Sequence, residues 1–150
     1  VRLTERHMAS APATSDQIQR VEADTDAAID TVLQSVPLEK ATRAVAVAGT
    51  ATTIAAAALG LKTYDSEVIN GSSISVDTVQ KTAEMLRSMT REERAALGYM
   101  HPGRVDVIGA GATIYARIMT RLHEITEGNI DSVTVSEHDI LDGIALSQVR

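Results

Sequence analysis

The chain lacks cysteine, phenylalanine and tryptophan, and it has only three tyrosines among its 150 residues. Without cysteine it can form no disulfide, no thiolate metal site and no cysteine nucleophile, a pattern that fits a cytoplasmic protein. The scarcity of aromatic side chains makes stacking on nucleobases a poor hypothesis. The core must therefore be built from Ala, Val, Ile, Leu and Met.

The charge and hydropathy of the chain exclude further classes of protein. The formal net charge is −6, so the basic face typical of nucleic-acid binding is not expected. No apolar run reaches the roughly 18 residues that a membrane-spanning helix needs, and no signal peptide is evident. A chain of this length buries about 70% of its unfolded surface. We expect residues 1–150 to form one soluble, cytoplasmic domain that binds neither nucleic acid nor membrane.

The segment AVAVAGTATTIAAAALG, residues 44–60, organises the rest of the chain. Residues 44–48 are an apolar run too short for a helix, which predicts a strand buried on both faces. Gly49 ends this strand, a helix of small residues follows from Thr50, and Gly60 stands where a helix C′ glycine is expected.

The turn at Gly49 is the candidate chemical site of the sequence. A helix that starts after glycine points unpaired N–H groups at one place, and glycine lets a phosphate approach the backbone closely. The candidate phosphate-binding residues are Gly49, Thr50, Ala51 and Thr52. The alternative is that Gly49 only makes a turn and Thr50 only caps the helix.

The segments before this turn predict one strand and one helix. Residues 1–6 alternate with a period of two, which predicts a strand. Thr14 and Gln17 form a capping-box pattern that opens an amphipathic helix, and Pro37 closes it. Because the chain starts at Val1 within a strand pattern, we expect it to be a piece of a longer protein.

The segments after the turn predict further helices and one strand. A helix begins at Ser75, and Thr90 opens a short one, so residues 72–98 form a helical insertion or cover. Residues 104–125 predict a helix with Gly109 and Gly111 inside it, where each glycine costs about 1 kcal/mol. Close approach of a neighbouring backbone explains these glycines, and a ligand passing over the helix is the alternative. Residues 131–135 predict a strand.

We expect no catalytic or metal chemistry at the last helix or at the histidines. Ser136 and Asp139 are expected to cap the last helix, and this cap explains the triad-like residue types around them. The histidines show no ligand spacing with one another or with carboxylates, which argues against a zinc site; they are His7, His101, His123 and His138. The order of elements predicts an α/β fold with parallel crossovers.

Four motifs in register carry a resemblance to a known family. They are VRLTERH, AVAGTATTIAA followed by LGL and YD, MHPGRVDVIGAGATIYA, and VTVSEHDILDGIAL. Together they resemble the exopolyphosphatase/guanosine pentaphosphate phosphohydrolase (Ppx/GppA) family in its actinobacterial form, over practically the whole chain. The resemblance implies a partial ribonuclease-H-like domain of the actin, sugar kinase and heat-shock ATPase superfamily, with helices packed on a short, mostly parallel sheet.

The resemblance also implies a place for this chain within such an enzyme. It matches the later part of the second domain, where Gly49 and Thr50 correspond to a phosphate-binding loop, and Ala48 stands where some relatives carry serine. In the last motif Ser136, Glu137 and Gly143 occupy consensus positions, to which we assign a structural role. In the strand order 3-2-1-4-5, residues 1–6 would be strand three, and the unpaired edges would recruit partners.

The departures from the family pattern limit the expected activity. The chain lacks the first-domain phosphate loop, the catalytic glutamate and the Asp-x-Gly-Gly-Gly-Ser loop. We therefore expect no catalytic residue and no metal ligand here, and an isolated chain that is inactive. The resemblance implies polyphosphate or guanosine pentaphosphate as substrate of the parent enzyme, Mg²⁺ as cofactor, and the remaining first domain and a homo-oligomer as partners. The alternative is an inactive phosphate- or nucleotide-binding or oligomerisation module.

Overall fold

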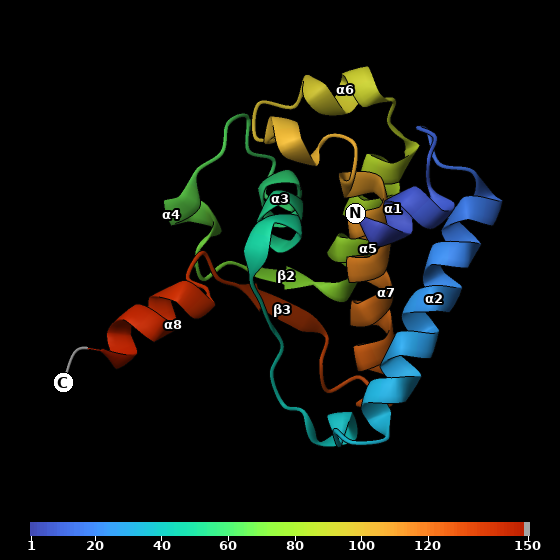
Figure 1. Cartoon of the computed structure of the whole chain (residues 1–150). Coiled ribbons are helices and arrows are strands. Elements are labelled where there is room, and N and C mark those ends of the chain that lie inside the picture. Colours follow the sequence, from blue (N-terminus) through green and yellow to red (C-terminus); the bar gives the residue numbers. More distant parts are fainter. Residues whose placement is uncertain (149–150) are drawn as a thin grey trace.

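The computed structural model describes residues 1–148 and shows an α/β arrangement around a small sheet (Figure 1). The sheet has the strand order β1-β3-β2, in which β1 (Val45–Ala46) pairs parallel with β3 (Ser132–Val135). On the other side of β3, β2 (Ser73–Ser75) pairs antiparallel, with Ile74 opposite Val133. One pairing is therefore parallel, as expected, whereas the antiparallel strand β2 was not predicted.

Eight helices and two short 3-10 turns surround this sheet among the described residues. The turns are Leu38–Lys40 and Pro102–Arg104. The helices are α1 (Arg2–His7), α2 (Ser15–Leu33), α3 (Ala48–Ala58), α4 (Ser66–Ile69), α5 (Val76–Ser88), α6 (Arg91–Ala95), α7 (Ile108–Ile125) and α8 (Ile140–Ser147). Figure 1 shows α2 on the outside of α7, and α8 projecting from the opposite side of the molecule.

The main core lies between the sheet and the helices α3, α5 and α7. It is mostly aliphatic, with Tyr99 as its buried aromatic residue, and small side chains in α3 let its neighbours approach closely. Side chains that are fully buried there include Ile54 of α3, Val79 and Leu86 of α5, Ile108 and Met119 of α7, and Val133 of β3.

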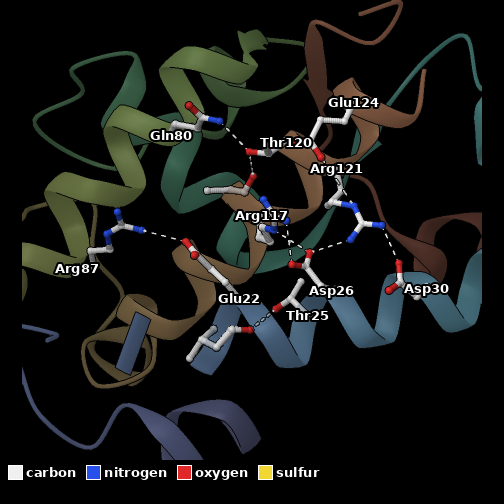
Figure 2. Close-up of polar contacts among 12 residues, drawn as sticks. Glu22, Thr25, Asp26, Asp30, Gln80, Arg87, Arg117, Thr120, Arg121 and Glu124 are labelled. Atoms are coloured by element: carbon white, nitrogen blue, oxygen red, sulfur yellow. Dashed lines mark hydrogen bonds and ion pairs between the residues drawn. The ribbon is translucent and has the colours of Figure 1, made fainter. Parts of the chain in front are cut away.

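Helix α2 is attached to α7 largely by charged side chains (Figure 2). Only Val21 and Thr25 of α2 are buried. Arg117 of α7 donates to both carboxylate oxygens of Asp26, at 2.7 and 2.8 Å, and Arg121 donates to Asp26 at 3.1 Å and to Asp30 at 2.7 Å. The hydrogen bond from Arg117, supported by Arg121, lowers the pKa of Asp26.

The first six residues form no strand, which corrects the sequence expectation. They lie in and beside helix α1, because tertiary contacts outweigh the short alternating pattern. Leu3 packs against a small cluster that contains Met8 and Val21. Arg6 and His7 both contact the Asp24 carboxylate of α2, at 2.7 and 2.9 Å. The expected strand three is therefore a helix docked on α2.

The strand before the central turn is shorter and more exposed than expected. Val45 is 57% exposed and Val47 is 48% exposed, so this strand is not buried on both faces. Since β1 lies at the edge of the sheet, one of its sides has no strand beside it among residues 1–148. Helix α3 begins at Ala48, and its N-cap residue is Val47. Thr50 therefore does not cap the helix.

Other local predictions are confirmed, with one exception. Both expected capping boxes form, Ser75 caps α5, and Gly60 has a positive φ of 67° after α3. The last helix is capped by Asp139 in a box with Asp142. Ser136 takes no part in that cap, because its hydroxyl donates to the carbonyl of His138. In the described part of the chain, no helix is both long and apolar enough to cross a membrane.

Candidate phosphate-binding site

The predicted site residues lie at the carboxyl ends of the two parallel strands. Helix α3 begins two residues after β1 ends, and Glu137 lies two residues after β3 ends. The Ser136 N–H donates to the Ala46 carbonyl at 2.9 Å and so ties these two ends together. In open α/β sheets, ligands bind at this end of parallel strands.

The N-terminus of α3 presents unpaired main-chain donors. Its N-cap residue, Val47, makes no side-chain hydrogen bond to the helix, so the N–H groups of the first turn have no intrahelical partner. The structure brings Gly49, Thr50, Ala51 and Thr52 together in this first part of α3. The helix dipole adds a partial positive charge at the same place.

Arg104 approaches this helix end, although the sequence pattern predicted no role for it. A Cβ placed on Gly49 would overlap the guanidinium of Arg104, so a larger residue at this position would require the guanidinium to shift. Arg104 Nη1 donates to the Thr53 hydroxyl at 3.1 Å, and that hydroxyl donates to the Gly49 carbonyl at 2.7 Å. Within residues 1–148, Arg104 forms no ion pair with a carboxylate. Its position after the Pro102-Gly103 turn in the third motif was the available signal.

The first turn of α7 lies beside the first turn of α3. A Cβ on Gly111 would lie 3.0 Å from the Thr50 hydroxyl oxygen, which explains the glycine at this position. The N-cap residue of α7, Val107, also makes no side-chain cap. Gly109 has a different neighbour, because a Cβ there would lie 2.9 Å from Arg94 Nη2. Both glycines thus accommodate side chains, not the backbone that was expected.

The four predicted residues differ in what they can offer an anion. The Ala51 side chain is buried, so this residue can contribute only its N–H. The Thr52 hydroxyl is 3.4 Å from the Gly49 carbonyl and so is already engaged. The Thr50 hydroxyl forms no hydrogen bond within residues 1–148. The main-chain donors, Thr50 and Arg104 are therefore the groups that can face an anion.

The comparison with family models identifies the chain. The model described as the Ppx/GppA phosphatase family matches residues 1–148. The chain belongs to the Ppx/GppA phosphatase family. It is 44% identical over 147 residues to Exopolyphosphatase 2 of Mycobacterium tuberculosis, which covers 98% of this chain and 46% of that protein. The chain thus spans about half the length of the curated relatives that it matches.

Solved structures of Ppx/GppA proteins show the same fold. A crystal structure of an exopolyphosphatase-like protein matches with a TM-score of 0.93 and 41% identity, over 97% of this chain and 47% of that one. The Aquifex aeolicus PPX-GPPA enzyme matches with a TM-score of 0.82 and 25% identity, over 99% and 46% of the two chains. The expected α/β fold of the ribonuclease-H-like, actin-like class is confirmed.

A pocket adjoins the phosphate-loop candidate in this Ppx/GppA chain. It has a volume of about 340 Å³ and shares Arg104 with the site; its other lining residues are Tyr64, Gly98, Tyr99, Met100 and His101. The Tyr64 hydroxyl donates to Glu137 at 2.5 Å, and burial together with this bond raises the pKa of Tyr64. The Glu137 N–H donates to the Asn70 side chain at 3.1 Å. Glu137 therefore has a fixed position beside the loop, consistent with a structural role.

Carboxylate and imidazole groups do not assemble into a metal site in residues 1–148. No three Asp, Glu or His side chains there lie close enough to hold one ion. Glu137 follows the end of β3, which pairs with the strand that leads into α3, and one of its oxygens accepts the Tyr64 hydroxyl. The described residues therefore do not fit a protein-held Mg²⁺ ion.

Proposed function

We propose that this chain is the phosphate-binding part of a phosphoanhydride hydrolase. The parent enzyme would release terminal phosphate from inorganic polyphosphate or the 5′ phosphate from guanosine pentaphosphate. One observation carries this proposal: Arg104, which forms no ion pair within residues 1–148, lies against Gly49 at the N-terminus of α3, where the N-cap residue makes no side-chain hydrogen bond. Family membership and the similarity to Exopolyphosphatase 2 support the reaction class.

The geometry suits the charge of the reacting group. Phosphoryl transfer depends on positioning and on neutralising the charge spread over the phosphoryl oxygens. The first N–H groups of α3, with the Thr50 hydroxyl, can donate to one oxygen of a phosphate, and the Arg104 guanidinium can donate to another. These residues bind and orient the phosphate. They provide no general base, so attack by water needs groups outside this chain.

We propose Mg²⁺ as the cofactor of the parent enzyme, bound to the phosphates of the substrate. In phosphoryl-transfer enzymes this ion binds phosphate oxygens, keeps several waters and uses few protein ligands. When bound, it would neutralise phosphate charge. Because the described residues do not form a metal site, we assign no Mg²⁺ ligand to this chain.

We also propose that residues 1–150 are an incomplete second domain of the parent enzyme. The first domain would be its main partner, and the parent would be a homo-oligomer. Residues 72–98, which contain β2, α5 and α6, would be a helical insertion that has become part of the core through Val79 and Leu86. The chain alone should then bind phosphate without turnover.

Two measurements test this function. Polyphosphate with Mg²⁺ should give phosphate release from the longer parent protein and none above background from residues 1–150. Titration calorimetry with tripolyphosphate should show that Arg104→Gln weakens binding to the chain about tenfold or more, since a hydrogen bond to a charged group contributes roughly 1.5–3 kcal/mol. Arg43→Gln, at the opposite end of β1, is the matched control. Sustained turnover by the chain alone, or equal affinities of the two variants, would contradict the proposal.

A further inference from the structure

Glu137 is a carboxylate at the same end of the sheet as the phosphate-binding turn. It stands two residues after β3, which pairs with the strand that leads into α3, and it is partly buried. A carboxylate and a guanidinium attract each other more strongly where they are partly shielded from water. Within residues 1–148, however, no ion pair joins Glu137 to Arg104. The structure therefore keeps these two opposite charges apart.

Tyr64 is the side chain that meets both charges. Its hydroxyl donates to a Glu137 oxygen at 2.5 Å, and its side chain lines the same pocket as Arg104. Burial and then the bond to Glu137 raise the pKa of Tyr64, whereas Thr52 and the positive charge of Arg104 act in the opposite direction. The phenol is therefore close to a carboxylate and to a guanidinium at once.

The backbone around Tyr64 is held in place before and after this residue. Asp65, the next residue, caps α4 with its carboxylate. On the other side, the carbonyl of Lys62 packs against Gly98 so closely that a Cβ on this glycine would overlap it. Tyr64 lies in the short stretch between these two fixed points, so its ring has a defined position at the pocket.

The backbone next to Glu137 is fixed as well. The side-chain oxygen of Asn70, at the end of α4, accepts the Glu137 N–H at 3.1 Å. The Gly71 N–H donates to the Val135 carbonyl at 2.8 Å, which ties the end of the α4 segment to the end of β3. These bonds bring the tyrosine and the carboxylate together although 73 positions separate them in the sequence.

We propose that Tyr64 is a positioning residue of the phosphate-binding site. By donating to Glu137 it holds this carboxylate away from Arg104, and the guanidinium stays available for a phosphate oxygen. The inference rests on the proposed function, in which Arg104 binds phosphate. Without the phenol hydroxyl, Glu137 loses its donor and Arg104 becomes its alternative partner, because a guanidinium binds a carboxylate as readily as a phosphate. Glu137 then competes with the phosphate for one cation.

A double-mutant cycle tests the inference, with tripolyphosphate affinity of the chain measured by titration calorimetry. Tyr64→Phe removes the donor and keeps the ring, so we expect affinity to fall about three- to fivefold, the size that competition from a partly exposed ion pair gives. In this background, Glu137→Gln should restore the lost affinity. In the unchanged chain, Glu137→Gln should have an effect at least about threefold smaller.

The cycle separates competition for Arg104 from simpler effects of the two substitutions. Removing a negative charge favours anion binding in both backgrounds, so only the excess gain in Tyr64→Phe measures the competition. Tyr115→Phe is the matched control, because it removes another tyrosine hydroxyl, on α7 and outside this pocket, and should leave the affinity unchanged. Thermal unfolding of each variant shows whether it is folded at the temperature of the titration.

Three results would overturn the inference. They are unchanged affinity for Tyr64→Phe, an equal effect of Glu137→Gln in both backgrounds, and a loss of affinity in Tyr64→Phe that Glu137→Gln does not restore. Arg104→Gln is measured in the same series. If it weakens binding while the cycle shows no coupling, only this inference fails. If it leaves the affinity unchanged, the proposed function fails and this inference fails with it.

Discussion

The guanidinium of Arg104 lies where the Cβ of any residue other than glycine would stand at position 49. This contact places a full positive charge at the positive end of the α3 dipole, an arrangement that is unfavourable without an anion nearby. The only side-chain hydrogen bond of Arg104 within residues 1–148 goes to the neutral Thr53 hydroxyl. The site therefore has an excess of positive character that a phosphate would neutralise.

Gly49→Ala tests this relationship directly. The added methyl group must displace Arg104 and break its bond to Thr53, so we expect tripolyphosphate affinity to fall about tenfold or more, as for loss of a charged hydrogen bond. Titration calorimetry measures the change. Gly143→Ala is the control, since no atom lies within 4 Å of a Cβ there. Unchanged affinity for Gly49→Ala would mean that the arginine position does not matter for binding.

Thr50→Val separates a binding role from a structural one. Valine keeps the shape that packs against Gly111 and removes the hydroxyl donor. Because Val47 is the N-cap residue, we expect the melting temperature to change little while tripolyphosphate affinity falls about tenfold. Calorimetry and thermal unfolding should be measured together. A lower melting temperature with unchanged affinity would show that Thr50 is only architectural.

The local part of this fold could be predicted from sequence because its signals are local. The box of Thr14 with Gln17 and that of Thr90 with Glu93 both bond within one helical turn. Gly60 follows α3 with the positive φ that glycine allows. Such contacts join residues a few positions apart, so their spacing is readable in the chain.

The parts that sequence reasoning missed depend on partners far along the chain. Residues 1–6 alternate like a strand, but they form helix α1. In this helix Arg6 pairs with Asp24 and Leu3 packs against the cluster that contains Val21. Likewise the predicted phosphate site is centred on Gly49, whereas the group that lies against Gly49, Arg104, comes from another motif. The sequence pattern alone does not show that these two residues lie close together in space.

Arg94 should be a major stabilising residue although it is charged. It is 3% exposed, and its guanidinium donates to the carbonyls of Leu86 and Arg87 at the end of α5, at 2.7 and 3.3 Å. We expect Arg94→Met to lower the free energy of unfolding by about 2 kcal/mol, because buried carbonyls lose their donors. Urea unfolding measures this. Arg91→Met, which breaks only an exposed pair with Asp106, should cost less than about 1 kcal/mol.

The attachment of α2 to α7 should weaken in acid. Arg117 and then Arg121 hold the pKa of Asp26 below its ordinary value. The ion pairs of Asp26 therefore stabilise the folded state fully above pH of about 4, the ordinary pKa of aspartate. This stabilisation is lost as the pH falls through the lower pKa that Asp26 has in the folded state. Asp26→Asn should cost about 1–2 kcal/mol at pH 7 and remove part of the acid sensitivity. Unfolding at several pH values checks this, with Asp16→Asn, in an exposed pair with Arg20, as the control.

Tyr115 should make the chain sensitive to alkali. Its hydroxyl is buried without a hydrogen-bond partner within residues 1–148, and burial raises the pKa of Tyr115 to about 12. The folded state thus favours the protonated phenol. Its contribution to stability is fully present below the ordinary pKa of about 10 and is lost as pH rises toward about 12.

Tyr115→Phe removes that hydroxyl and keeps the ring. Since an unpaired buried hydroxyl costs free energy, we expect the variant to be more stable than the parent sequence by up to about 1 kcal/mol at pH 7, and to lose less stability between pH values of about 10 and 12. Tyr64→Phe is the matched control, because its hydroxyl donates to Glu137 and its loss should bring no gain. Thermal unfolding across this pH range distinguishes the two. A destabilised Tyr115→Phe would mean that the hydroxyl has a partner in solution.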